Sequence, residues 1–219
     1  MALRVVIEST TKRAFATAID WPGWARAGKT PDEAIDTLLA YAPRYARVAR
    51  RAKVAFSAPA TVRGLTIVER LPGSASTDFG VPGAAAAVED EPLPTRDLTR
   101  VTNLVQAAWQ TFDRVATAAS GTTLTLGPRG GGRQVPKIVE HVREAEAAYL
   151  HQLGWKVRDS AMPALRDGFL EALRLRATDE PLPDPNRVRR PWSPRYAARR
   201  SAWHALDHAW ELEDRIIPG

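Results

Sequence analysis

Three of the four histidines in this chain have a spacing suited to holding a metal ion. His204 and His208 are four residues apart in a helical-looking run, which puts both imidazoles on one face, one turn apart. His141 lies in a second helical run and could approach the pair from a neighbouring helix. Three such ligands leave one tetrahedral position open for water or substrate, as in catalytic zinc sites. His151, about 80° round the helix from His141, is interpreted as a surface residue.

The chemistry of such a site follows from its ligands. Three neutral imidazoles leave the ion its full positive charge. A thiol bound there loses its proton, and the pKa of a bound water falls toward neutrality. The chain contains no Cys, which excludes disulfides and cysteine-bound zinc, so any reacting thiol has to come from outside. The sequence therefore predicts activation of an external thiol or of water.

Two glutamates are candidates for a supporting role at the site. Glu144 and Glu211 each follow a predicted ligand by three residues, and each is open to three interpretations: a partner that orients the ligand, a fourth ligand, or a solvated charge. A di-iron carboxylate bundle needs Glu three residues before His. Those positions hold Ile138, Ser201 and Ala205, so the di-iron interpretation fails.

Other residues near the histidines have weaker assignments. The glycine-rich loop 127–133 could bind an anion through its backbone N–H groups, helped by Arg129 and Arg133, or could be a flexible connection. Trp203 and Trp210 flank the histidine pair and are interpreted as bundle core rather than pocket wall.

Composition restricts the class of protein. With 219 residues, 44% hydrophobic and 26% charged, the chain is ordinary globular material. No signal-peptide run or long uncharged apolar stretch occurs, which predicts a cytoplasmic protein without membrane contact. The net charge of +6 is concentrated in basic runs at 44–53 and 187–200. We interpret both runs as solvated surface, and nucleic acid is not an expected partner, since neither run has interleaved aromatics or a helix-turn-helix.

The first 72 residues predict a small sheet with one helix. Thr30 as N-cap and Glu33 closing a capping box start that helix, which should run to about residue 52 unless Pro43 kinks it. Alternating or apolar runs predict strands at 4–8, 14–19 and 61–69.

This segment resembles HicB-like domains. The stretch IDWPGWARAGKTPDEA at 19–34 is similar to their Pro-Gly turn, short third strand ending in Gly, and Thr-capped helix with Glu-Ala. The resemblance implies a βββαβ module over 1–72, which could bind a protein partner or act as an antitoxin-like regulator. No toxin region or DNA-binding tail follows it, which favours a recruited structural or substrate-covering module.

The rest of the chain predicts a linker and a helical bundle. Residues 73–94 are rich in Pro, Gly and Ala, which indicates a linker or an extended strap. An antiparallel four-helix bundle is expected over 95–219. Its helices are predicted at 96–119, 134–153, 158–177 and 194–215.

A bundle with His on its second helix and H-x-x-x-H on its fourth resembles the DinB-like superfamily. The matching stretches are HVREAE at 141–146 and RSAWHALDH at 200–208. The resemblance implies a metal triad of His141, His204 and His208, a divalent ion that is commonly zinc or nickel, and a homodimer. It also implies thiol-transfer or isomerase chemistry with a low-molecular-weight thiol.

Together these observations predict an α+β protein: a HicB-like domain followed by a DinB-like four-helix bundle. The leading hypothesis is a metal-dependent enzyme, a thiol S-transferase or a hydrolase, acting on a small-molecule substrate. The alternatives are a non-enzymatic interaction protein with a structural metal and a HicB-type antitoxin-like regulator. A solvent-open cavity at the triad favours the enzyme, and a closed four-ligand site favours a structural metal.

Overall fold

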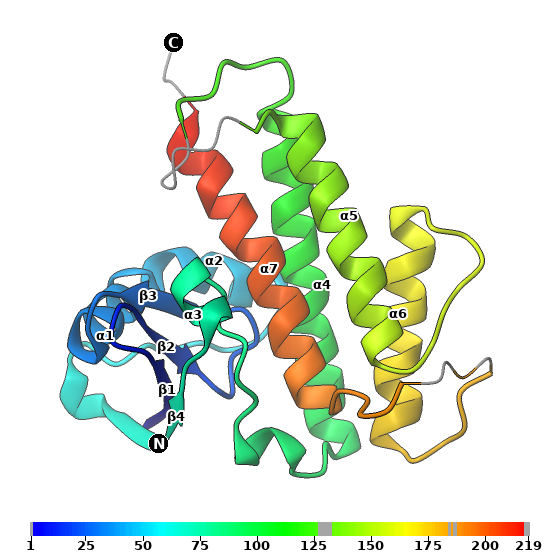
Figure 1. Cartoon of the computed structure of the whole chain (residues 1–219), viewed down its shortest axis with the longest axis horizontal. Helices are drawn as coiled ribbons and strands as arrows, with labels where there is room; N and C mark the ends of the chain where they lie inside the picture. The colour runs from blue at the N-terminus through cyan, green and yellow to red at the C-terminus, as the bar shows by residue number, and fades with distance from the viewer. Residues whose placement is uncertain (1, 127–132, 184, 186–187, 217–219) are drawn as a thin grey trace.

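A computed structural model describes residues 2–126, 133–183, 185 and 188–216. A four-stranded sheet with short helices lies against one side of a group of long helices (Figure 1). The predicted α+β class is therefore confirmed. Among the described residues, no helix combines the length and apolar character that crossing a bilayer requires.

The sheet contains every strand that the sequence predicts. Its strands are β1 (Leu3–Ser9), β2 (Ala14–Ala18), β3 (Ala25–Gly28) and β4 (Leu65–Pro72). Their order is β3-β2-β1-β4, with β1 antiparallel to β2 and parallel to β4. All five residues of β2 are buried, and alternate side chains of a strand point to opposite faces, so the sheet is covered on both sides.

The helix expected from residue 30 to about 52 is two helices. Thr30 caps the first, α1 (Pro31–Ala40), by accepting a hydrogen bond from the backbone N–H of Glu33. The second, α2 (Ala42–Arg51), follows after Tyr41, with Pro43 in its first turn. Proline lacks an N–H, and its ring clashes with the carbonyl four residues earlier. The kink expected at Pro43 is therefore a complete break.

Residues 73–94, which we call the strap, contain two short helical elements, α3 (Ala75–Phe79) and η2 (Ala87–Asp90). On the sheet side, the carboxylate of Glu8 accepts hydrogen bonds from the Thr77 hydroxyl at 2.5 Å and from the backbone N–H groups of Gly83 and Ala84. The strap is thus a packed segment rather than an extended one. The domain limits at residues 72 and 94 remain predictions.

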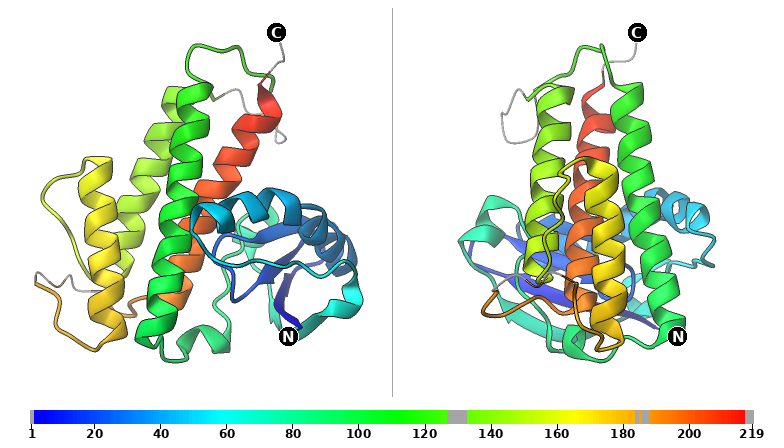
Figure 2. Two further views of the ribbon diagram at one scale, coloured as in Figure 1. Left: turned by 180° about the vertical axis from the view of Figure 1, so that it is seen from behind. Right: turned by 90° about the vertical axis from the view of Figure 1, so that its right-hand side faces the viewer.

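Four long helices form the rest of the chain: α4 (Thr95–Ala118), α5 (Val135–Gln152), α6 (Met162–Ala177) and α7 (Pro194–Arg215). All four were predicted, but the antiparallel arrangement holds only in part. In the views of Figures 1 and 2, α5 runs opposite to α7, whereas α4 runs parallel to α7 and α5 parallel to α6. The connection 153–161 permits the parallel pair, because an extended chain of that length spans about 30 Å and α6 about 24 Å.

Helix α7 lies at the centre of the molecule, between the sheet and the other long helices (Figure 2). One continuous apolar core joins residues of the sheet, α1, α2, the strap and all four long helices. The turn before β3 comes close to α7 because Gly23 has no side chain. A Cβ there would lie 2.7 Å from Cδ1 of Leu206 and 3.2 Å from Ala202, and the φ of +93° also favours glycine.

Candidate metal centre

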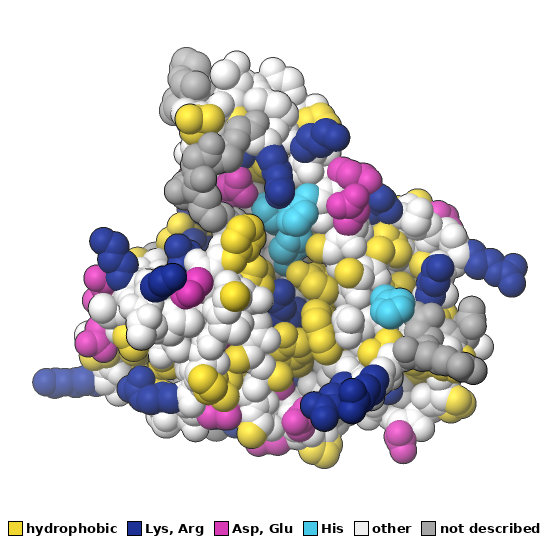
Figure 3. All heavy atoms as spheres, viewed as in Figure 1, with side chains coloured by type: hydrophobic (Ala, Val, Ile, Leu, Met, Phe, Trp, Pro, Cys, Tyr) yellow, Lys and Arg dark blue, Asp and Glu magenta, His cyan; other side chains and the backbone are white. Residues whose placement is uncertain are grey.

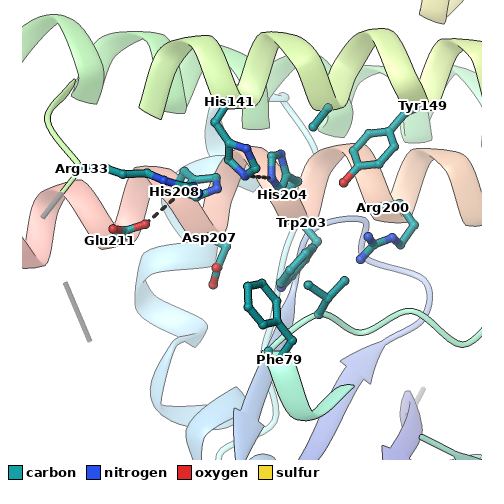
Figure 4. Close-up of a pocket in the computed structure, with 13 residues that line it drawn as sticks. Phe79, Arg133, His141, Tyr149, Arg200, Trp203, His204, Asp207, His208 and Glu211 are labelled. Carbon is teal, nitrogen blue, oxygen red and sulfur yellow. Dashed lines mark hydrogen bonds and ion pairs between the residues drawn. The ribbon is translucent and has the colours of Figure 1, made fainter. Parts of the chain in front are cut away.

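The three predicted ligands come together from two neighbouring helices. His204 and His208 lie one turn apart on α7, and His141 faces them from α5 (Figure 4). Their ring centroids are 4.7–5.1 Å apart. One nitrogen from each ring lies within 4.8 Å of the others, so the three histidines are close enough to bind one metal ion.

The spacing within the group fits ligation better than hydrogen bonding. Nε2 of His204 lies 3.3 Å from Nε2 of His141, beyond the usual range for an N–H donor. Two imidazole nitrogens bound to one tetrahedral zinc at its usual bond length lie about 3.3–3.4 Å apart. The residues present therefore fit a divalent ion. The buried Nδ1 of His204 has no hydrogen-bond partner among the described residues.

His208 is oriented by a chain of polar contacts. Its Nδ1 lies 2.9 Å from Oε2 of Glu211, and because a carboxylate only accepts, Nδ1 is the donor of this hydrogen bond and Nε2 is the ring nitrogen left to act as a ligand. Arg215 donates to the other oxygen of Glu211 at 2.8 Å, and to the backbone carbonyls of Thr125 and Arg133. The side chain of Arg215 is only 3% exposed, so this support is built into the core.

Two of the histidines are held neutral by their surroundings. Burial, followed by repulsion from His208 and His141, lowers the pKa of His204 well below 6.5. Burial also lowers the pKa of His141, with further contributions from His208 and Arg133. Burial alone would raise the pKa of Glu211, but its hydrogen bonds to His208 and Arg215 lower it overall. At neutral pH, His141 and His204 therefore present lone pairs and Glu211 is a carboxylate.

The histidines line a cavity of about 470 Å³. In the space-filling view, histidine side chains lie in a hollow of the surface, between charged side chains of both signs (Figure 3). Helices α5 and α7 form one wall, and the strap forms another through Phe79, Gly80 and Val81. The remaining lining residues are Arg133, Ala145, Tyr149, Arg200, Trp203, Asp207 and Glu211.

Some of the supporting residues that the sequence suggested line the cavity, and others do not. Glu211 contacts His208, whereas Glu144 is exposed and does not line the cavity. Arg133 lines the cavity, while Arg129 lies outside the described residues, so the anion-binding loop stays a prediction. His151 is exposed, as expected.

Two interpretations of the sequence need correction near the cavity. Trp203 is a buried core residue that packs against Phe15 and Ala25, as expected, but it also lines the cavity, whereas Trp210 belongs to the main core. The basic run 187–200 is not simply solvated, since Arg199 is 4% exposed and Arg200 is 7% exposed. Arg200 precedes His204 by four residues, so its helical phase was a signal that the sequence offered. Tyr149 and the strap residues gave no comparable signal.

Comparisons of this chain with known protein families, with curated proteins and with solved structures gave no match. The geometry of the site therefore carries the functional conclusion.

Proposed function

We propose that this chain is a metal-dependent enzyme in which His141, His204 and His208 hold a divalent ion at the wall of the cavity. The observation that carries the proposal is the convergence of three imidazole nitrogens, from two helices, within 4.8 Å of one another beside about 470 Å³ of open space. Zinc or nickel suits three neutral imidazoles.

The donor set favours catalysis over a structural role. A structural zinc site is closed by four protein ligands, whereas a catalytic site keeps one position open. Among the described residues, no fourth His, Asp or Glu joins the cluster, and Glu211 is engaged with His208 and Arg215. The runner-up function, a protein-interaction module with a structural metal, would require a closed site.

The residues of the chain prepare the site for an external nucleophile. The lowered pKa values of His141 and His204 leave these two rings neutral, and Glu211 accepts from Nδ1 of His208, which leaves Nε2 as the ligand atom of that ring. When bound, a divalent ion supplies a Lewis acid that lowers the pKa of a thiol or water. The proposed reaction class is transfer to an external low-molecular-weight thiol, or hydrolysis, on a small-molecule substrate.

The family assignments belong to the same proposal. Helices α5 and α7 carry the histidines in the order that the DinB-like resemblance implies, and β1–β3, α1 and β4 follow the element order of a HicB-like module. Because the strap supplies part of the cavity wall, we assign the substrate-covering role to the strap and give the N-terminal module the role of anchoring it through Glu8, rather than an antitoxin role. A homodimer, a protein partner and a cytoplasmic location are retained as parts of this hypothesis.

Metal content of protein purified without chelating resin tests the proposal. We expect about one equivalent of a divalent ion in the wild type, and almost none in His204→Ala/His208→Ala. His151→Ala is the matched control and should keep its metal, because this histidine is exposed and outside the cluster. Wild-type protein that takes up no zinc, nickel or cobalt on incubation would refute the proposal.

Cobalt-loaded protein separates the two candidate functions. Addition of a small thiol should change the visible absorption spectrum of the cobalt form if one coordination position is open. A spectrum that does not respond to thiol, azide or cyanide would indicate a closed, structural site.

A further inference from the structure

Arg200 is a second polar feature of the cavity, separate from the histidines. It lies one turn before His204 on α7, about 6 Å along the helix axis, and lines the same cavity (Figure 4). Its exposed fraction is only 7%. Arg200 is therefore a buried cation beside the candidate metal centre.

This cation has no counter-ion in the described part of the chain. Its only hydrogen bond there runs from a terminal nitrogen to the backbone carbonyl of Pro82 at 3.2 Å, and its buried Nε has no partner. Burying a guanidinium without an anion is costly, so such groups are normally paired. The adjacent Arg199 is paired: it donates to both carboxylate oxygens of Glu89.

Aromatic side chains hold Arg200 in place. Its guanidinium carbon lies 5.0 Å from the ring centroid of Trp203 and 5.7 Å from that of Tyr149. Trp203 is 3% exposed, and its indole Nε1 is a second buried donor that has no partner among the residues described. Two unpartnered donors thus belong to neighbouring side chains of one cavity wall.

The carboxylates of the cavity do not neutralise Arg200, since each already has a partner. Asp207 pairs with Arg26 at 3.2 Å, and Glu211 pairs with Arg215 at 2.8 Å. Arg133 adds a further cation to the lining. The cavity is therefore suited to a ligand that brings its own negative charge.

We propose that the guanidinium of Arg200, packed against the ring of Trp203, forms the subsite for a carboxylate of the substrate. The substrate class is a small organic acid whose carboxylate lies about one helical turn from its reacting atom. That second statement rests on the proposed metal-dependent function, whereas the carboxylate subsite itself does not. The planar guanidinium matches the geometry of a carboxylate, and the indole ring packed against it is placed to report on binding.

Titration of ¹⁵N-labelled protein with small acids and their amides tests this subsite. The probes are benzoate and butyrate, with benzamide and butyramide as neutral controls. The indole N–H signal of Trp203, assigned with Trp203→Phe, should shift saturably with the acids and not with the amides. The indole of Trp109, which donates to Ser201 at 3.0 Å, provides an internal control that should not move.

Variants of Arg200 give the quantitative result. Arg200→Gln should weaken acid binding by about tenfold or more, because a charge-assisted contact is lost. Arg200→Lys keeps the charge but not the planar fork, and should weaken it by a smaller factor. Dispersed indole signals and an unchanged melting temperature establish that each variant is folded. If Arg200→Gln does not fold, the affinities of Arg200→Lys and wild type for the acids are compared instead.

Metal-loaded and metal-free protein separate the inference from the proposed function. Acid binding that requires Arg200 and persists without metal supports the carboxylate subsite, even if the metal centre fails its own test. Acid binding that disappears with the metal and is unchanged in both Arg200 variants would overturn the subsite and leave the proposed function standing. Equal binding of acids and amides would also overturn it.

Discussion

Arg199 and Arg200 are adjacent on helix α7 and both donate to the backbone carbonyl of Pro82 in the strap, but their buried polar groups are in different states. Arg199 donates to Glu89 and to the carbonyls of Pro82 and Ala84. In the cavity wall, Arg200 Nε, Trp203 Nε1 and His204 Nδ1 have no partner among the described residues. One of two adjacent arginines is thus ion-paired within the chain, whereas the other keeps a buried Nε without a partner among the described residues.

This difference distinguishes buried polar groups that stabilise the fold from buried polar groups that could bind a ligand. A buried polar group that serves stability has its hydrogen bonds made within the chain, as Arg199 does. A buried polar group that awaits a ligand keeps donors free and costs stability until the ligand binds. Of the four buried side-chain atoms without partners in the described region, three belong to residues that line the cavity.

The largest effect that would test this difference is expected at Arg199. Arg199→Met leaves Glu89 buried without its cation, so the free energy of unfolding should fall by about 3–5 kcal/mol. Arg200→Met removes a buried charge that has no counter-ion in the described part of the chain, and should leave the free energy of unfolding unchanged or raise it. Urea unfolding of the two variants measures the contrast.

A second substitution sharpens this result. Arg199→Met/Glu89→Leu removes both charges and should recover most of the lost stability. If Arg199→Met and Arg200→Met lower the free energy of unfolding equally, the inferred difference between the paired Arg199 and the unpaired Arg200 is wrong.

An intermediate effect is expected where the sheet meets α7. Gly23→Ala should lower the free energy of unfolding by about 2–3 kcal/mol, because the new Cβ meets Leu206 and the positive φ strains any other residue. Gly121→Ala is the matched control: its φ is +78° but nothing lies within 4 Å. Its free energy of unfolding should fall by only about 1 kcal/mol. Chemical denaturation of both variants checks this. Similar decreases in the two variants would mean that a Cβ at residue 23 does not clash with α7.

The smallest effect concerns the orientation of His208. Glu211→Gln should weaken metal binding by about tenfold, because the carboxylate that holds the proton of His208 on Nδ1 is lost. Glu144→Gln should leave it unchanged, because Glu144 is exposed and lies outside the cavity. Competition with a chromogenic chelator measures both affinities. Identical affinities in the two variants would contradict the assignment of Glu211.

Much of the secondary structure could be predicted because its signals are local. The capping residue Thr30 and the apolar spacing of α4 and α7 depend only on neighbours in the sequence. The same locality explains the histidine pair, since four residues make one helical turn. The approach of His141 to this pair was correctly expected from its place in a second helical run, from the DinB-like resemblance and from the small number of histidines in the chain.

The remaining features depend on long-range contacts that no local pattern encodes. The strap looked like a linker because its Pro, Gly and Ala content conceals the contacts of Thr77 with Glu8 and of Glu89 with Arg199. Arg200 looked solvated because its basic neighbours dominate the run. The parallel pairing of α5 with α6 follows from how the connection 153–161 crosses the bundle, which its composition does not reveal.

The central position of α7 has a consequence for how the chain folds during synthesis. Arg26 meets Asp207 across 181 residues of sequence, and Arg199 meets Glu89 across 110. The ribosome delivers α7 after every element that it packs against, so the sheet face carrying Phe15 and Ala25 stays uncovered until then. Such late, non-local closure is expected to make folding slow and to expose apolar surface to chaperones in the interval.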